Sequence, residues 1–268
     1  TSYIRAQAEK YRANGHQEIV LTGVNLGAYG RDRSPPGTLA HLLAELLPEL
    51  GDLRLRLSSL DPRDLEDALI QQFAQHPNLC PYLHLSIQSG DDLILKRMGR
   101  DHGRQRVLEQ IRKLREARPE LLLGADMIVG FPTEERSAFQ NTLTLVEEAD
   151  ITFLHVFRYS DRPGTPAAAI PRRFRVPARE IQWRSEQLRQ KGASQLANTA
   201  KRWIGCEVQV LVETLQSDTA WGKTAHFLPV RLPMAADSHA GQRLTVHLQG
   251  FDPLQQTLYG QSLPAIAP

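Results

Sequence analysis

Short apolar runs alternate with amphipathic segments along the first 160 residues, and this alternation predicts the fold. The runs are rich in leucine, isoleucine and valine, which is typical of buried strands. They cover 18–24, 53–57, 82–87, 121–129 and 151–157. The segments between them place apolar residues at helical spacing. Strands that alternate with helices of this length form βαβ units, so we expect an α/β domain with five parallel strands.

Polar residues mark where several of these helices are expected to begin. Thr38 can accept a hydrogen bond from the first turn of the helix that follows it. Asp61-Pro62 is expected to open the next helix, because proline is favoured in a first turn. Thr133 is predicted to cap a helix that runs through Glu148.

The pattern changes after the fifth run. Residues 159–177 combine proline, alanine and arginine without periodicity, which indicates a linker. A helix is predicted from Ala178 to about Trp203. Beyond Gly205, short β-type runs separated by glycines indicate a small antiparallel barrel or sandwich. The expected domains are an α/β part at 1–176, a linker helix at 177–202 and a small all-β part at 203–265.

Polar residues or glycines follow four of the predicted strands. The clusters are Thr22-Gly23-Val24-Asn25, Ser58-Ser59, Gln88-Ser89-Gly90 and Gly130-Phe131-Pro132. Each cluster alone is typical of turns. Because ligands bind outside the carboxyl ends of parallel strands, four clusters at one edge favour a pocket for a polar small molecule. The sequence contains no glycine-rich phosphate-binding motif and no serine nucleophile elbow.

Three charged or titratable residues near these strands have alternative interpretations. His84, between Leu83 and Leu85, is expected to be a satisfied core or barrel-lumen histidine rather than a general base. Asp126 lies in an apolar strand, so it should pair with an arginine or histidine or contact a ligand. A different barrel enzyme with Asp126 and His84 as acid and base is an alternative. Arg100 can reach a carboxylate at the strand ends or end a helix in solvent.

Charge and cysteine content narrow the function further. The net charge is only +2, but residues 158–202 hold eleven Lys or Arg and three acidic residues. This asymmetry suggests a polyanionic partner, with a solvated basic face as the alternative. No apolar run approaches a membrane span and no signal peptide is recognisable, so we expect a cytoplasmic protein with no membrane partner. Cys80 and Cys206 do not have metal-site spacing, which argues against structural zinc.

Five segments in order resemble the radical S-adenosylmethionine (SAM) methylthiotransferases that modify tRNA. The similar segments are EIVLTGVNLGAYG (18–30), LRLSSLDP (55–62), YLHLSIQSGDDLILKRMGR (82–100), DMIVGFPTEERSAF (126–139) and FRYSDRPGTPAA (157–168). LTGVN and LRLSSLDP most resemble the bacterial subgroup that acts on threonylcarbamoyladenosine beside the anticodon. The resemblance implies addition of a methylthio group to C2 of that nucleoside, with SAM and a [4Fe–4S] cluster as cofactors and tRNA as partner.

The resemblance also implies roles for individual residues. The residues expected to contact SAM are Thr22, Gly23, Asn25, Ser58, Ser59, Gln88, Ser89, Arg100, Ile128, Gly130 and Phe131. The tail resembles a TRAM domain, which binds RNA. Its RNA-facing candidates are Lys223, His226, Phe227 and Arg231. Phe227 is equally a candidate for the barrel core.

The chain departs from the family pattern in two places. Thr133-Glu134-Glu135 stands where the family usually has Gly-Glu-Thr, a mild change at an expected helix cap. The Cys-x3-Cys-x2-Cys loop that binds the cluster is absent. Three thiolates hold such a cluster, and Cys80 and Cys206 cannot replace them. We therefore expect a partial radical SAM (β/α) barrel that starts downstream of the loop, lacks the first strand and the N-terminal domain, and is inactive alone.

Two consequences follow from this partial barrel. The missing strand would leave the sheet edge at 18–24 unpaired, and such an edge can aggregate or pair with another chain. The alternative function for the same chain is a non-catalytic tRNA-binding module that retains the scaffold.

Overall fold

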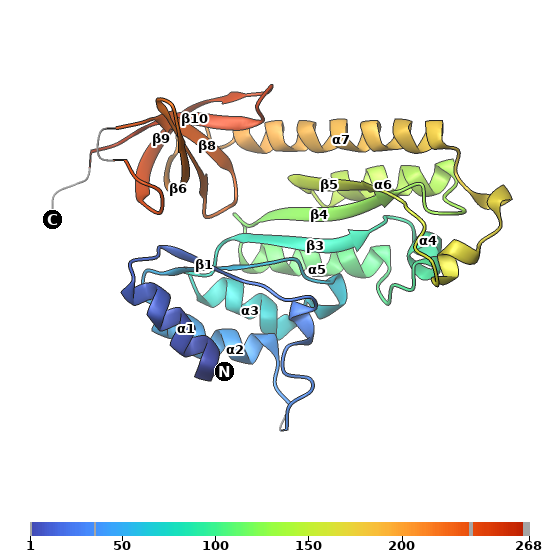
Figure 1. The fold of residues 1–268 in the computed structure, drawn as a ribbon, viewed down its shortest axis with the longest axis horizontal. Coiled ribbons are helices and arrows are strands. Elements are labelled where there is room, and N and C mark those ends of the chain that lie inside the picture. Colours follow the sequence, from blue (N-terminus) through green and yellow to red (C-terminus); the bar gives the residue numbers. More distant parts are fainter. Residues whose placement is uncertain (1, 35, 236–237, 265–268) are drawn as a thin grey trace.

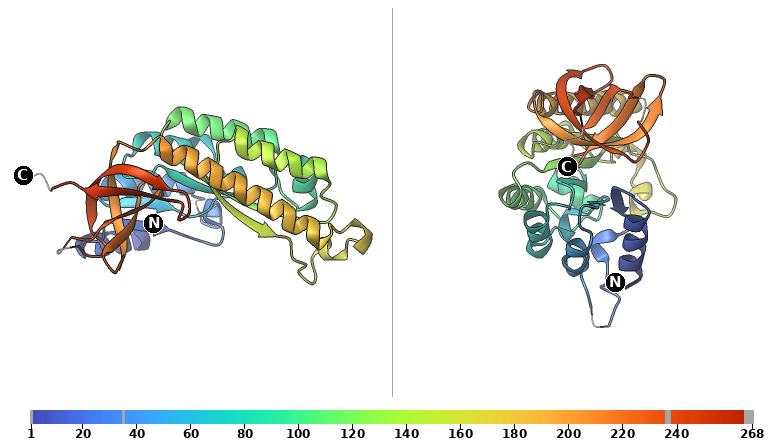
Figure 2. Two further views of the ribbon diagram at one scale, coloured as in Figure 1. Left: turned by 90° about the horizontal axis from the view of Figure 1, so that it is seen from above. Right: turned by 90° about the vertical axis from the view of Figure 1, so that its left-hand side faces the viewer.

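The computed structural model describes residues 2–34, 36–235 and 238–264 and has two parts (Figure 1). The first part is a curved layer of parallel strands with helices on its outer side, and the second is a small β-barrel. The long helix α7 (Ala178–Lys201) joins them. Figure 2 shows α7 beside α6 on the outer side of the strands. Residues 1 and 265, two of the expected domain limits, lie outside the described residues.

All five predicted strands of the first part form. They are β1 (Glu18–Leu21), β2 (Arg54–Leu57), β3 (Tyr82–Gln88), β4 (Leu122–Val129) and β5 (Phe153–Arg158). The other helices are α1 (Ser2–Ala13), α2 (Leu39–Leu46), α3 (Asp67–Gln75), α4 (Asp92–Arg97), α5 (Arg104–Ala117) and α6 (Arg136–Glu148). Thr38 caps α2 as predicted, because its side chain accepts a hydrogen bond from the His41 backbone N–H. Asp61 opens only a short 3-10 turn, η3 (Pro62–Asp64), ahead of α3.

The predicted parallel sheet is confirmed in direction but is interrupted between β2 and β3. β1 pairs with β2, and β3, β4 and β5 form a second ladder, all parallel. Only the isolated bridges Leu55–Leu79 and Leu60–Leu85 join the two sets. Within the described residues, β1 and β5 each pair on one side only, so the barrel is open. This agrees with the expected partial barrel and its unpaired first edge.

Successive side chains of a strand point to opposite faces of the sheet, so every second residue faces the concave side. Leu83, Leu85 and Ile87 of β3 point outward into the core formed with the helices, and all are buried. The alternate residues, including His84 and Ser86, face the concave side, where Asp126 of the neighbouring strand contacts both of them. The open barrel therefore presents a polar column of side chains rather than a second hydrophobic core.

The second part is a closed five-stranded barrel. Its strands are β6 (Glu207–Gln216), β7 (Thr219–Thr224), β8 (Pro229–Pro233), β9 (Arg243–Asp252) and β10 (Thr257–Ser262), in the order β10-β8-β7-β6-β9. All pairs are antiparallel except β10–β8, so the antiparallel prediction holds for four of the five. The sequence pattern did not predict β8, because the prolines at both of its ends are more typical of a loop than of a strand.

The segment predicted as a linker, 159–177, is packed against the first part. It forms two short turns, η4 (Pro166–Ala169) and η5 (Arg172–Phe174). Tyr159 and Ile170 pack against Phe131 in a small apolar cluster. The segment therefore acts as a wall of the first part rather than as a free connection.

Thr133 does not cap α6, so this prediction was wrong. Glu135 occupies the N-cap position and the helix begins at Arg136. Thr133 has a φ of 72°, and its backbone N–H donates to the Phe174 carbonyl at 2.7 Å. A left-handed backbone is unfavourable for a β-branched residue, so the family's glycine at this point suits the local geometry better.

The substitution Thr133→Gly should therefore stabilise the protein. Glycine relieves the left-handed strain, and we expect the free energy of unfolding to rise by about 1 kcal/mol, which corresponds to a melting temperature roughly 2–4 °C higher. Thr144→Gly, inside α6, is the control and should lower the melting temperature. A melting temperature of Thr133→Gly at or below that of the wild type would contradict the assignment.

Candidate functional site

Two cavities open at the carboxyl ends of the parallel strands, and Arg100 lines both. The polar cavity, of about 460 Å³, lies beyond β1 and β2. It is lined by Thr22, Gly23, Val24, Asn25, Leu26, Ser58, Ser59, Asp61, Arg63, Ser86 and Arg100. The basic cavity, of about 740 Å³, lies beyond β3, β4 and β5. It is lined by Gln88, residues 96–100, Ile128, Phe131, residues 157–160, Arg162, Thr165, Pro166 and Ala167.

The polar cavity brings together the first two predicted clusters. Thr22, Gly23 and Asn25 follow β1, and Ser58 and Ser59 follow β2. A Cβ added at Gly23 would lie 3.7 Å from the nearest protein atom outside its chain neighbours, which is ordinary contact. Protein packing therefore does not require this glycine. What the missing side chain provides is open backbone beside the cavity, where a ligand can approach closely.

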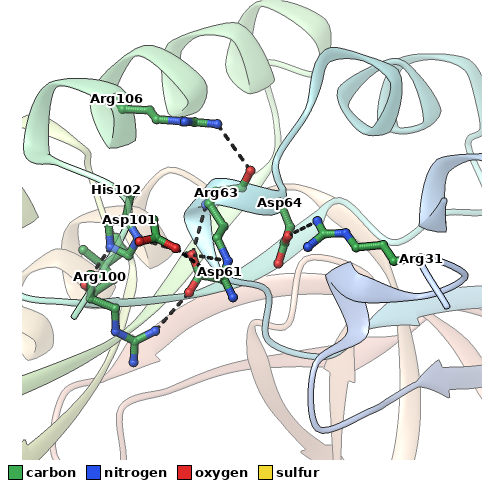
Figure 3. Close-up of polar contacts among 9 residues, drawn as sticks. Arg31, Asp61, Arg63, Asp64, Arg100, Asp101, His102 and Arg106 are labelled. Atoms are coloured by element: carbon green, nitrogen blue, oxygen red, sulfur yellow. Dashed lines mark hydrogen bonds and ion pairs between the residues drawn. The ribbon is translucent and has the colours of Figure 1, made fainter. Parts of the chain in front are cut away.

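Asp61 fixes the position of Arg100, the residue that lines both cavities (Figure 3). Its Oδ2 accepts a hydrogen bond from Arg100 Nη1 at 3.0 Å. Its Oδ1 lies 3.2 Å from His102 Nδ1 and accepts from the Arg63 backbone N–H at 3.1 Å. His102 is buried, and its Nε2 lies 3.2 Å from the Ile87 carbonyl oxygen. Asp61 thus ties Arg100 to the end of β3, a role that the sequence pattern did not reveal.

The charge of Asp61 is stabilised by these contacts. Burial by itself would raise the pKa of Asp61. Hydrogen bonds from His102 and the Arg63 backbone, with the positive charge of Arg100, outweigh burial and lower the pKa to about 2. Arg100 uses one of its five donors on Asp61, and its side chain remains 31% exposed. It can therefore bind an anion in either cavity while Asp61 fixes its position.

The third predicted cluster is divided by the backbone at the end of β3. Gln88 has a φ of 75° and lines the basic cavity. Ser89 is fully buried behind the strand, where it accepts from the Asp91 backbone N–H at 3.2 Å. Ser89 therefore lines neither cavity, and its contact with SAM stays a prediction. Gly90 is needed for packing, because an added Cβ would lie 2.5 Å from the Asn141 carbonyl oxygen of α6.

The fourth cluster is divided in a similar way. Ile128 and Phe131 line the basic cavity, whereas Gly130 does not. The Gly130 backbone N–H donates to Glu134 Oε2 at 2.6 Å, and its φ is 79°. Glu134 is itself buried and forms a 2.9 Å ion pair with Arg184 of α7. Gly130 therefore shapes the turn that places its two neighbours at the cavity.

The basic cavity carries positive charge that the protein does not neutralise. In the described part of the chain, the charged groups of Lys96, Arg97, Arg158 and Arg162 take part in no ion pair or hydrogen bond. Most of the eleven basic residues at 158–202 point elsewhere, and several are paired, as Arg184 is. The sequence thus indicated the basic region that contributes Arg158 and Arg162 to this cavity. The other two unpaired cations, Lys96 and Arg97 of α4, were not predicted from the sequence.

Three of the predicted RNA-facing residues, Lys223, His226 and Phe227, lie at or near the junction of the two parts, whereas the contacts of Arg231 lie within the small barrel. The Phe227 ring stacks on Tyr82 of β3 with centroids 4.5 Å apart, so the junction already occupies it. Lys223 Nζ lies 4.6 Å from the Phe227 centroid and 3.1 Å from Glu213. Arg231 forms a 3.2 Å ion pair with Asp252. RNA contact by these residues stays a prediction, and the structure gives Phe227 an alternative role in packing.

His226 is also part of this junction. Its ring lies 4.3 Å from that of Trp203, and its Nε2 is buried without a hydrogen-bond partner. Burial lowers the pKa of His226 to about 4, so the imidazole is neutral at physiological pH. A neutral, half-buried imidazole contributes no charge to phosphate binding. Its predicted RNA contact is untested, and its surroundings favour packing.

Asp126 pairs with histidines, which is one of its predicted alternatives. Its Oδ1 lies 3.1 Å from His84 Nε2 and 3.3 Å from His155 Nδ1. Burial opposes the charge of Asp126, but the hydrogen bond and charge of His84, together with His155, outweigh it and lower the pKa. His84 is a satisfied histidine on the concave face, as expected. His155 lies on the same face of β5 and was not predicted from the sequence.

The cysteines of this chain do not fit an iron–sulfur cluster. Cys80 is buried beside the ion pair of Arg56 and Glu18, and burial raises the pKa of its thiol to about 12. Cys206 is exposed at the far end of α7. A [4Fe–4S] cluster is held by several thiolates, and a protonated thiol is a poor metal ligand. No step of a reaction is therefore assigned to a cluster on these residues.

The contacts of Asp61 predict a specific dependence of stability on pH. Because its pKa in the folded state is about 2 and its ordinary value is 3.8, its contribution is present above about pH 4 and is lost as the pH falls through 2. Asp61→Asn should lower the free energy of unfolding by about 2 kcal/mol at neutral pH. Urea unfolding at several pH values should find this difference shrinking below pH 4. Asp67→Asn, at an exposed ion pair, is the control and should change little. A difference that persists unchanged at pH 2.5 would contradict the assignment.

Comparison with known sequences places the chain among SAM-dependent proteins. Residues 1–146 match the Radical SAM superfamily. The chain is 43% identical over 230 residues to threonylcarbamoyladenosine tRNA methylthiotransferase MtaB of Rickettsia prowazekii, covering 85% of this chain and 53% of the relative. It is 43% identical over 199 residues to the protein of the same name from Thermotoga maritima, covering 74% of this chain and 45% of that one. The chain thus spans about half the length of these curated relatives.

The fold agrees with this match. Coproporphyrinogen III oxidase (HemN) of Escherichia coli, titled a radical SAM enzyme, superimposes with a TM-score of 0.51 at 15% identity, covering 82% of this chain and 61% of that one. Within the described residues, no helix is both long and apolar enough to cross a membrane. Since the sequence match covers more than half of the chain, and an open parallel barrel carries cavities at its strand ends, the chain belongs to the radical SAM superfamily.

Proposed function

We propose that this chain forms the SAM-binding and tRNA-binding parts of a tRNA methylthiotransferase that adds a methylthio group to C2 of threonylcarbamoyladenosine next to the anticodon. Two similar proteins with 43% identity are named for a transfer to this nucleoside. The observation that carries the proposal is the pair of cavities joined at Arg100, one polar and one basic. A polar cofactor and a polyanionic substrate need these two environments side by side.

The polar cavity and the inner wall of the basic cavity suit SAM. Hydroxyls of Ser58 and Ser59 are available to a ribose or a carboxylate, and Arg100 to the methionine carboxylate. Ile128 and Phe131 offer an apolar surface for the adenine. A [4Fe–4S] cluster would supply the electron for radical chemistry on SAM, but Cys80 and Cys206 do not fit such a cluster, so the roles proposed for this chain are limited to binding. The residues of the polar cavity bind and orient SAM, with Arg100 at its carboxylate.

The unpaired cations of the basic cavity suit the anticodon stem-loop. Lys96 and Arg97 lie on α4, Arg158 ends β5 and Arg162 follows it, so the four approach the cavity from two sides. Cations without protein partners can neutralise phosphates at little desolvation cost, and they release counterions from the RNA. The exposed aromatic ring of Phe157 on the same wall can stack on an extruded base.

A second candidate function is a non-catalytic tRNA-binding module. It is favoured by the two cysteines, which do not fit a cluster. In that case the polar cavity would bind SAM weakly or not at all, while the basic cavity would still bind tRNA. The chain on its own is expected to be inactive under either proposal.

Analysis of tRNA nucleosides tests the proposed reaction. Disruption of the gene that encodes this chain should remove 2-methylthio-threonylcarbamoyladenosine from the cell's tRNA and leave threonylcarbamoyladenosine in its place, as read by mass spectrometry. Return of the intact gene should restore the modification. Persistence of the methylthio group after disruption would exclude the proposed reaction.

Charge reversal in the basic cavity tests the binding surface. The double substitution Arg158→Glu/Arg162→Glu should weaken tRNA binding by at least about tenfold at 0.1 M salt and reduce the slope of log K against log salt by about 2. Arg112→Glu/Arg189→Glu, on the outer faces of α5 and α7, is the matched control and should change binding much less. Filter binding or fluorescence anisotropy gives both quantities. Equal losses in the two double variants would mean that the basic cavity does not bind tRNA.

A further inference from the structure

A cluster of three potential metal ligands lies on the concave face of the open barrel, apart from both cavities. His84 of β3 pairs in register with Gly124 of β4, and Asp126 pairs with His155 of β5. One nitrogen or oxygen from each of His84, Asp126 and His155 lies within 4.8 Å of the others. We propose that these three residues bind one divalent transition-metal ion.

Gly124 creates the space that this cluster occupies. A Cβ added there would lie 2.3 Å from His84 Nδ1 and 2.4 Å from the Tyr82 hydroxyl oxygen. No side chain larger than hydrogen fits at this point of β4. The glycine therefore lets the rings of Tyr82 and His84 lie over the neighbouring strand, which turns His84 Nε2 toward Asp126.

The distances suit a single ion. Asp126 Oδ1 lies 3.1 Å from His84 Nε2 and 3.3 Å from His155 Nδ1. Ligands bound at about 2.1 Å are this far apart when they subtend roughly 95–105° at the ion, an angle close to tetrahedral or octahedral geometry. The two imidazole rings lie 4.6 Å apart and are inclined by 34°. Small rotations of the exposed His155 side chain would complete the geometry.

Neighbouring hydroxyls support buried His84 and half-buried Asp126. The Tyr82 hydroxyl lies 2.8 Å from His84 Nδ1, so the Nδ1–H can donate to it and leave the Nε2 lone pair free for an ion. Ser86 donates to Asp126 Oδ2 at 3.4 Å, which leaves Oδ1 toward the histidines. Such outer contacts orient metal-binding histidines and carboxylates in known sites. A histidine buried only for packing would not require this arrangement.

The site is open on the side of His155, whose side chain is 60% exposed. Three protein ligands leave coordination positions for water or a small ligand from the concave side. Two imidazoles and one carboxylate suit Zn²⁺ or Fe²⁺, whereas sites for Mg²⁺ or Ca²⁺ are built from oxygen ligands. The ligand class is therefore a zinc-like or iron-like divalent ion.

Metal titration of the whole chain tests the inference. After treatment with a chelator, the protein should bind one Zn²⁺ by calorimetry, and Co²⁺ should give visible absorption without a thiolate charge-transfer band. His155→Ala, at an exposed position that should not disturb folding, and Asp126→Asn should each weaken Zn²⁺ binding by about 100-fold or more. Tyr82→Phe keeps the ring and removes the hydroxyl, and it should weaken binding by about tenfold.

Two control variants separate this site from incidental binding. His41→Ala removes an exposed histidine of α2, and Cys206→Ser removes the exposed thiol, so both should leave Zn²⁺ affinity unchanged. Zn²⁺ should raise the melting temperature of the wild type and of both controls, but not that of His155→Ala. The proposal is overturned if no stoichiometric binding occurs, if His155→Ala and Asp126→Asn bind Zn²⁺ as the wild type does, or if Cys206→Ser abolishes binding.

Discussion

The buried side chain of Arg56 connects the first part of the structure to the small β-barrel. It forms an ion pair with Glu18 of β1, with Nε 2.6 Å from Oε1, and donates to the carbonyls of Thr224 and Ala225 in the second barrel. Its guanidinium also lies over the rings of Tyr82 and Phe227. Burial by itself would lower the pKa of Arg56, but Glu18 outweighs burial and raises it, so the charge is retained. Removal of one partner of such a pair leaves a buried charge and costs several kcal/mol.

This junction closes the amino-terminal end of the open barrel and leaves the other end free. Phe227, with a φ of 70°, inserts between the two parts and stacks on Tyr82, while Phe153 meets both rings edge-on. Among the described residues, no aromatic cluster of this kind covers the carboxyl ends of the strands. Their side chains instead line the polar and basic cavities, with Arg100 held by Asp61 between them. Other α/β barrels likewise use one end of the barrel for stability and the opposite end for ligand binding.

The two edge strands of the open barrel carry exposed side chains. β1 and β5 each lack a second neighbour among the described residues, and Val20, His155 and Phe157 on these strands are exposed. The concave face is therefore accessible from the side as well as from the strand ends.

Much of the architecture could be predicted from local sequence patterns. The five apolar runs, the cap at Thr38 and the small C-terminal barrel all follow from residue periodicity and turn chemistry, which act over a few neighbouring residues. The order of polar strand ends also indicated a pocket, because parallel strands bring their ends to one edge. Thr133 is an exception: a cap was predicted from residue type, but the turn before α6 places it in a left-handed conformation.

Only the tertiary structure decided which side chains from distant segments contact each other. Ser89 turns behind the sheet because the backbone bends at Gln88, and Arg100 is fixed by Asp61, 39 residues away in the chain. His155 reaches Asp126 because β4 and β5 pair in one register, and a shift by one residue would turn one of them to the other face. The sequence by itself determined most of the elements and the alternation of faces along the five parallel strands, since these depend on local periodicity. Which residues touch depended on register and packing between distant segments, and no local pattern records these.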